Sequence, residues 1–180
     1  MTFDKQFKSY DLDIHGVRLP QFDIEKRHKH QALVSEDCSN YDFLRQLCLN
    51  GFKELGVRKG SKKYEKYVER AKYELATLKD LGFIDYTLLV WDVINYCKEK
   101  DIPTGLGRGS AAGSLVLFLI GVTGIDPVEH DLYFERFVSK IRAKKKVVDG
   151  VTYLDGSLMC DVDLDICYYR RGDVIKYLEE

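Results

Sequence analysis

A glycine-rich loop, followed at a distance by alternating aspartates, constrains this chain more than any other feature. Residues 105–114 read GLGRGSAAGS, an apolar run follows to residue 120, and residues 161–165 read DVDLD. Three glycines at alternate positions allow positive φ and a close approach of the backbone to a ligand. We expect Ser110 to Ile120 to form a buried helix, whose first N–H groups and dipole would favour an anion at the loop.

The loop also fits two other interpretations. Its GxGxxA spacing is a degenerate form of the dinucleotide-binding fingerprint, which needs a preceding strand and an acidic residue about twenty positions on. Residues 101–104 are too short and are broken by Pro103, and Asp126 stands before a proline, so this interpretation is disfavoured. A purely structural glycine turn stays open on local evidence, although Arg108 supplies a planar cation suited to phosphate oxygens.

The segment Asp161 to Ile166 alternates acidic and apolar residues, which is the period of a strand with one charged face. Asp161, Asp163 and Asp165 should therefore point the same way, a costly arrangement unless a cation is bound. Carboxylates in a row are ligands that Mg²⁺ takes, together with substrate phosphates. A calcium loop is excluded because Ile166 stands where that loop needs glycine. An exposed edge strand carrying protective charges is the other interpretation.

The composition indicates an ordinary water-exposed globular chain. The 180 residues are 45% hydrophobic, enough for one sizeable domain or two small ones. A formal net charge of −1 gives no global argument for nucleic acid. The five cysteines form no CxxC pair, so we expect reduced thiols and no zinc. The longest apolar run is too short for a membrane span, and we expect no membrane partner and a cytoplasmic location.

Periodicity and capping residues predict the remaining elements. Amphipathic helices are expected at residues 39–55, 62–81 and 85–100, the first two capped by serine. A further helix should begin at Pro127, be capped by Asp126 and reach about residue 138. Residues 147–153 should form a hairpin with an Asp-Gly turn.

Several of these segments, in this order, resemble the bacterial replicative DNA polymerase III alpha subunit. The similarity covers most of the chain, and weaker similarity reaches back to Val17. The segments that carry it are Gly105 to Ser114, Gly121 to Pro127, Leu132 to Phe137, Met159 to Ile166 and Arg171 to Leu178.

The resemblance implies an α+β fold, namely the palm of the DNA polymerase beta-like nucleotidyltransferases, with a small mixed sheet flanked by helices. It divides the chain into an extended lead-in (1–38), a helical region that belongs to the thumb or flanks the palm (39–100), and an incomplete N-terminal part of the catalytic palm (101–180). The polar extension at 139–158 departs from the bacterial pattern and is compatible with a divergent lineage, including a viral one in a host cytoplasm.

The resemblance also implies a template-directed nucleotidyltransferase that binds DNA primer-template and a dNTP. Asp161 and Asp163 would be catalytic and would hold two Mg²⁺ ions, or Mn²⁺, with Asp165 in support. The triphosphate would be held by Gly107, Arg108, Gly109, Ser110, Arg136 and Arg171. Basic residues between the two motifs would either contact DNA phosphates or form a solvated loop: Lys140, Arg142, Lys144, Lys145 and Lys146.

Two departures from the family pattern loosen the segments without removing a ligand. Leu106 and Cys160 stand where the family usually has proline. The family's third carboxylate and fingers have no counterpart in this sequence, so we expect the chain to be inactive without a second polypeptide that supplies them. A non-catalytic binding or assembly module with the same fold is the alternative, as is a stand-alone nucleotidyltransferase.

Overall fold

The computed structural model describes residues 21–138, 145–148, 151–154 and 160–179 of the chain. Within these residues the fold is built almost wholly from helices. The helices are α1 (Lys26–Ala32), α2 (Asn40–Glu54), α3 (Lys62–Leu81), α4 (Ile84–Glu99), α5 (Leu115–Leu119) and α6 (Arg171–Glu179), with 3₁₀ turns η2 (Ala111–Gly113), η3 (Phe134–Arg136) and η5 (Tyr168–Arg170), and the strands are β1 (Lys145–Val148) and β2 (Val151–Leu154).

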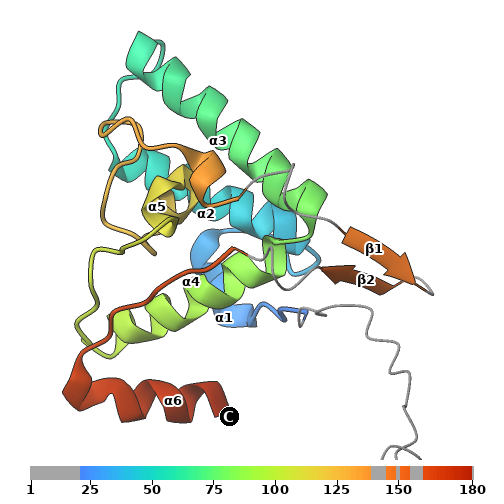
Figure 1. Cartoon of the computed structure of the whole chain (residues 1–180), viewed down its shortest axis with the longest axis vertical. Helices are drawn as coiled ribbons and strands as arrows, with labels where there is room; N and C mark the ends of the chain where they lie inside the picture. The colour runs from blue at the N-terminus through green and yellow to red at the C-terminus, as the bar shows by residue number, and fades with distance from the viewer. Residues whose placement is uncertain (1–20, 139–144, 149–150, 155–159, 180) are drawn as a thin grey trace, which may run out of the picture.

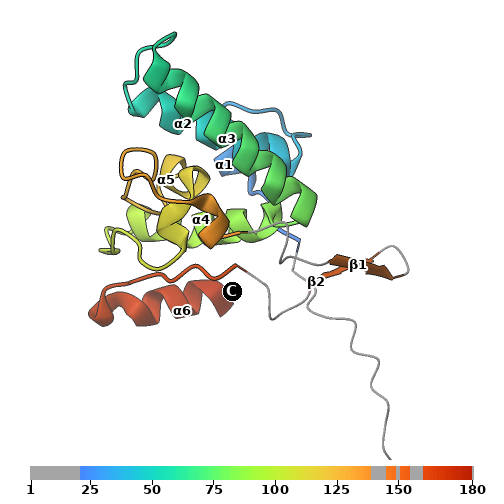
Figure 2. The same cartoon turned by 45° about the horizontal axis from the view of Figure 1, so that its top comes forward.

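The short helix α5 lies at the centre, and α2 and α3 pack against it (Figure 1). It is apolar on every side: four of its five residues are buried. Helix α4 packs on α2, and α6 packs in turn on α4, where the rings of Tyr96 and Tyr177 stack at 3.9 Å. Figure 2 shows α6 as a separate layer along the outer side of α4. Among the described residues, no helix is long and apolar enough to cross a membrane.

The three long helices confirm the predictions made from periodicity and capping. The Ser39 side chain accepts a hydrogen bond from the Asp42 amide at the start of α2, and Ser61 accepts one from Tyr64 at the start of α3. Helix α3 ends at Gly82, whose φ of 79° closes the last turn. Trp91 of α4 belongs to the core, because only 8% of it is exposed.

The predicted fold class, α+β with a small mixed sheet, is wrong for the part of the chain that the structure describes. The strands there are β1 and β2, which pair only with each other, antiparallel, with Val148 opposite Val151. This hairpin confirms the one expected at residues 147–153. Figures 1 and 2 show it to one side of the helices.

The acidic segment explains why the sheet was expected. Residues 161–165 join no strand, and the one bridge nearby pairs Ile166 with Thr104. Val162 and Leu164 pack against the helical core, while Asp161 and Asp165 are exposed. An extended segment lying on helices alternates inward and outward residues just as a strand does, so its period of two does not require a sheet.

Three local predictions are also corrected. The segment expected to be an extended lead-in contains α1, whose residue His28 is only 1% exposed. The helix expected from Pro127 to residue 138 is instead one turn, capped by Asp126, followed by the 3₁₀ turn η3; Asp131 between them has a φ of 50°. The helix expected from Ser110 to Ile120 is broken at Ser114, whose backbone is extended. The predicted domain boundaries at residues 38 and 100 stay predictions.

Candidate functional site

The glycine loop and the acidic segment lie side by side. The Gly105 amide donates a 2.8 Å hydrogen bond to the Asp165 carbonyl oxygen, and the Cys167 amide donates one of 3.0 Å to the Pro103 carbonyl. With the bridge between Thr104 and Ile166, these contacts set the two segments antiparallel. Residues about sixty positions apart in the sequence thus form one edge of the molecule.

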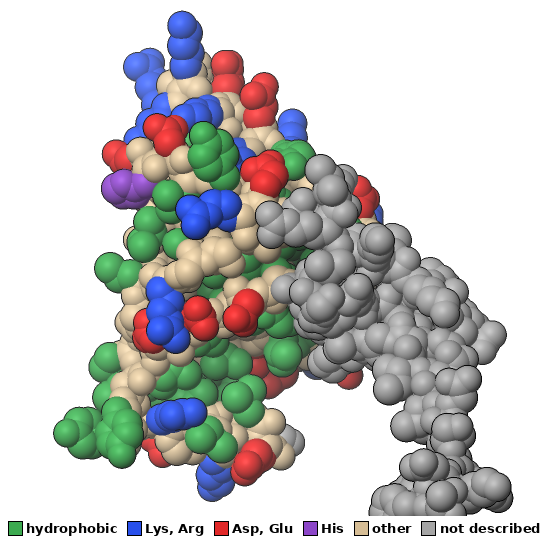
Figure 3. Space-filling model, in the orientation of Figure 1, with side chains coloured by type: hydrophobic (Ala, Val, Ile, Leu, Met, Phe, Trp, Pro, Cys, Tyr) green, Lys and Arg blue, Asp and Glu red, His purple; other side chains and the backbone are tan. Residues whose placement is uncertain are grey.

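Arg108 connects the loop to the aspartates. Its Nη2 atom lies 3.6 Å from Oδ1 of Asp163, and its Nε atom lies 3.5 Å from Oδ1 of Asp165. All three side chains are partly exposed, so the ion pairs are screened by water and contribute little to stability. Figure 3 shows a basic side chain among acidic ones along the path of the acidic segment. The guanidinium group offsets the repulsion between the two carboxylates.

The glycines permit this close approach. Gly109 has a φ of 65°, and a Cβ atom there would lie 3.2 Å from Oδ2 of Asp163. At Gly105, a Cβ atom would lie 2.8 Å from the Cβ of Asp165, closer than two carbon atoms pack. A side chain at either position would therefore push the loop away from the aspartates.

The loop presents backbone donors that the rest of the described chain does not use. Within the described residues, the amides of Gly107, Arg108, Gly109 and Ser110 donate to no acceptor. Gly107 and Gly109 both have positive φ, at 93° and 65°. Successive N–H groups in such a turn make an anion-binding concavity. With Arg108, they give this edge the donors that a phosphate group needs.

An ion pair on α3, between the partly exposed Arg70 and the buried Glu74, holds the far end of the loop in place. Glu74 is fully buried, and its carboxylate accepts hydrogen bonds from the amides of Leu115 and Val116, each at 3.0 Å, and from the Ser114 hydroxyl at 2.9 Å. Arg70 donates to Glu74 at 2.6 Å. Burial raises the pKa of the Glu74 carboxyl, and the amides and Arg70 oppose that rise without cancelling it.

Arg70 fixes two further backbone segments. Its Nη2 atom donates to the Gly113 carbonyl at 2.9 Å and to the Leu132 carbonyl at 3.0 Å. The Arg70–Glu74 pair therefore joins α3, the break at Ser114 and the segment before η3. Our sequence prediction missed this pair. Its signal was a glutamate beside Ala71, Leu75 and Leu78 on the apolar face of α3, with an arginine four residues before it.

This pair corrects the expected source of anion binding. We predicted that the helix after the loop would point its first N–H groups at the ligand. Instead, Glu74 and the Ser114 hydroxyl already accept from the first amides of α5. The candidate donors are thus the amides of the loop itself rather than a helix N-terminus.

The other predicted site residues are less closely gathered. Arg136 is exposed on η3, and Arg171 is exposed as the first residue of α6. Within the described chain, neither forms an ion pair with the aspartates. Lys140, Arg142 and Lys144 lie outside the described residues, and Lys145 and Lys146 are the first two residues of β1.

The carboxylate oxygens of the aspartates suit a hard cation. The described side chains, however, do not form a complete set of metal ligands. Carboxylate oxygens are what Mg²⁺ prefers. Within the described ranges, no three His, Cys, Asp or Glu side chains lie close enough together to hold a metal ion.

Just before the aspartates, Cys160 is buried, and this burial raises the pKa of its thiol to about 12. Cys160 thus anchors the segment as a neutral apolar residue.

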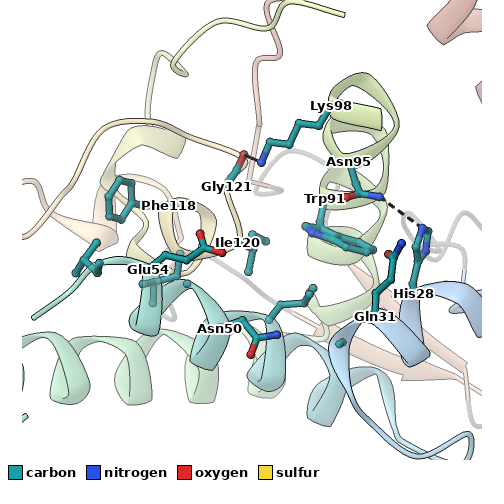
Figure 4. Close-up of a pocket in the computed structure, with 15 residues that line it drawn as sticks. His28, Gln31, Asn50, Glu54, Trp91, Asn95, Lys98, Phe118, Ile120 and Gly121 are labelled. Carbon is teal, nitrogen blue, oxygen red and sulfur yellow. Dashed lines mark hydrogen bonds between the residues drawn. The ribbon is translucent and has the colours of Figure 1, made fainter. Parts of the chain in front are cut away.

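A separate cavity lies elsewhere, among α1, α2, α4 and α5. It has a volume of about 470 Å³. Figure 4 shows Lys98 reaching across it to the Gly121 carbonyl, at 2.9 Å, and Asn95 turned toward His28, at 3.5 Å. Its lining includes no residue of the glycine loop or of the acidic segment. This cavity is therefore not the candidate phosphate site.

Comparison with known proteins gives the family of this chain. Residues 42–180 match the profile of the bacterial DNA polymerase III alpha NTPase domain. The chain belongs to the bacterial DNA polymerase III alpha family. The matched region contains the glycine loop, Arg108, the Arg70–Glu74 pair and the three aspartates.

Individual relatives have the same name. The chain is 37% identical over 169 residues, 94% of its length, to a DNA polymerase III subunit alpha of Streptococcus pyogenes serotype M3. It is 39% identical over 145 residues, 81% of its length, to that of Aquifex aeolicus, and 37% identical over 162 residues, 89% of its length, to that of Helicobacter pylori J99. The chain spans only 11–13% of the length of these relatives.

Proposed function

We propose that this chain supplies the triphosphate- and metal-binding edge of a DNA-directed DNA polymerase. The observation that supports the proposal most strongly is the contact of Arg108 with both Asp163 and Asp165, at 3.6 and 3.5 Å. A cation between two carboxylates, beside a loop of unused amides, offers donors for an anion and acceptors for a metal ion at one edge.

In this proposal, the loop binds the phosphates. The amides of Gly107 and Gly109, the hydroxyl of Ser110 and the guanidinium of Arg108 donate hydrogen bonds to phosphate oxygens. A triphosphate would compete with Asp163 and Asp165 for Arg108, and the two carboxylates would then be released to bind a metal ion. Ligand binding would thus replace the two internal ion pairs of Arg108 with contacts to the phosphate and to the metal ion.

The aspartates hold the metal ions. Asp161 and Asp163 are the proposed Mg²⁺ ligands, with Asp165 in support, and Mn²⁺ would suit the same oxygen atoms. When bound, such ions lower the pKa of the attacking primer hydroxyl and stabilise the leaving pyrophosphate. Asp161 and Asp165 are exposed, and Asp163 is half-buried, so all three are accessible to a ligand from solvent.

Two further partners belong to the proposal. The basic residues from Lys140 to Lys146 would contact the phosphates of a primer-template, and Arg136 and Arg171 would add charge near the nucleotide. We also propose that polymerisation requires further polypeptide, because the relatives are much longer than this chain. A cytoplasmic location remains our expectation for a replication enzyme.

Binding measurements test the proposal without requiring polymerase activity. We expect Mg²⁺ together with a dNTP to raise the melting temperature of the chain, and Asp161→Asn or Asp163→Asn to abolish that rise. The matched control is Asp173→Asn, which removes an exposed carboxylate of α6 that pairs with Arg170 instead. If the melting temperature stays constant with Mg²⁺ and dNTP, the site is not formed and the chain is a binding or assembly module.

A further inference from the structure

Helices α2 and α3 enclose an open groove of about 700 Å³, at the side of the molecule away from α6. None of its lining residues belongs to the glycine loop or to the acidic segment. We propose that this groove is a docking site for an amphipathic helix with acidic flanks, supplied from outside these 180 residues.

The floor of the groove is apolar. Cys48, Ala71 and Leu75 are buried at its base, and Phe52 and Val68 are half-buried beside them. Leu49 lines the groove with 43% of its surface exposed. A groove with an apolar floor accepts the apolar face of a helix, which inserts side chains spaced three and four residues apart.

The rim has charges of one sign. The charged residues that line the groove are all basic and all exposed: Arg45 and Lys53 on α2, Lys59 in the connection, and Lys72 on α3. Among the described residues, none of the four forms an ion pair with a carboxylate. On a chain whose net charge is −1, a rim of four unpaired cations around an apolar floor is complementary to an acidic, amphipathic partner.

The two longest segments outside the described residues do not complement the charge of the rim. Residues 1–20 contain three acidic and three basic residues, so they have no acidic excess. Residues 139–146 are strongly basic and would repel the rim. The charges of the rim therefore favour an acidic amphipathic helix from outside these 180 residues.

A nucleic acid fits the floor less well than a helix does. Leu49, Val57 and Val68 are aliphatic and offer no flat face on which a base could stack. The groove contains two aromatic rings, those of Phe52 and Tyr64. Their ring centroids are 6.2 Å apart, and their planes are tilted by 57°. They form no parallel platform. The rim cations therefore have a better partner in carboxylates than in phosphates.

Fluorescence anisotropy with designed peptides tests the docking site on the full chain. The probe is a labelled peptide of about four helical turns, with leucines along one face and glutamates elsewhere. A matched peptide has lysine in place of each glutamate. We expect the glutamate peptide to bind, the lysine peptide not to bind, and binding to weaken as salt rises from about 50 to about 300 mM.

Variants locate the interaction. Leu49→Glu and Lys72→Glu should each weaken binding of the glutamate peptide several-fold, and together about tenfold or more. Lys100→Glu, an exposed charge reversal at the end of α4, is the control and should change the affinity less than twofold. The proposal is overturned if both peptides bind equally, if the groove variants behave like the control, or if single-stranded DNA binds with the same dependence on Leu49 and Lys72.

Discussion

The backbone amide of Gly105 donates a 2.8 Å hydrogen bond to the carbonyl oxygen of Asp165. This bond sets the register between the glycine loop and the acidic segment, and it brings Arg108 within 3.6 Å of both Asp163 and Asp165. A change that breaks this register should therefore alter ligand binding more than it alters stability, because the contacts at this edge are partly exposed.

Gly109 offers the clearest substitution of this kind. Alanine there would be strained by about 1 kcal/mol, because φ is 65°, and its Cβ would press on Asp163. Gly60→Ala is the matched control: its φ is 82°, but no atom lies within 4 Å of the added Cβ. Urea unfolding should show similar losses of stability in both variants. Calorimetric titration should show weaker Mg²⁺–dNTP binding only in Gly109→Ala. Equal binding by the two variants would contradict the register between the glycine loop and the acidic segment.

Glu74→Gln tests the buried support of the loop. Replacing the carboxylate leaves Arg70 without its partner and turns an amide donor toward the amides of Leu115 and Val116, so we expect a loss of about 3 kcal/mol in the free energy of unfolding. Glu69→Gln, on the exposed face of α3, is the control and should change stability by less than about 0.5 kcal/mol. A similar midpoint of urea unfolding in both variants would show that the pair does not support the fold.

The sequence predicted the parts of the fold that depend on local signals. The caps at Ser39, Ser61 and Gly82 and the apolar period of the long helices lie within one or two turns of the residues they organise, so α2, α3 and α4 could be placed closely. The break at Ser114 could not be predicted in this way, because it depends on Glu74, forty residues earlier in the sequence.

The acidic segment shows the other limit. Its alternation agrees with the exposure of Asp161 and Asp165, and the glycine loop lies beside the acidic segment through the contacts at Gly105 and Arg108. The alternation does not distinguish a strand from an extended segment lying on helices, since Val162 and Leu164 face the core in either case. The predicted sheet was wrong for that reason.

Cysteine reactivity tests the position of the acidic segment. Because burial raises the pKa of Cys160 to about 12, its thiolate fraction stays negligible at pH 8 and grows only as the pH approaches that value. Iodoacetamide labelling followed by mass spectrometry should modify Cys160 only after unfolding in urea. Cys167, which is partly exposed seven residues later, is the internal control and should react first. Equal labelling of the two thiols in native buffer would show that the segment is not anchored there.

The basic residues before and within β1 should govern salt-sensitive DNA binding. Replacing Lys144, Lys145 and Lys146 by glutamate should weaken binding to a primer-template duplex. The slope of log affinity against log salt should become shallower by about 1 for each DNA phosphate that the protein no longer neutralises. Lys100→Glu again serves as the control. Anisotropy titrations at several salt concentrations measure the slope, and an unchanged slope in the triple variant would assign these lysines to a solvated loop.

The central claim is that the loop amides and the aspartates form one site. Mn²⁺ takes the same oxygen ligands as Mg²⁺, and its unpaired electrons broaden the NMR signals of nearby nuclei, so it reports directly on this proximity. In a ¹⁵N-labelled chain with a dNTP present, substoichiometric Mn²⁺ should broaden the amide signals of Gly107 and Gly109 first, and Asp163→Asn should restore them. If those two signals keep their intensity while amides elsewhere broaden, the loop and the aspartates do not share a metal–nucleotide site.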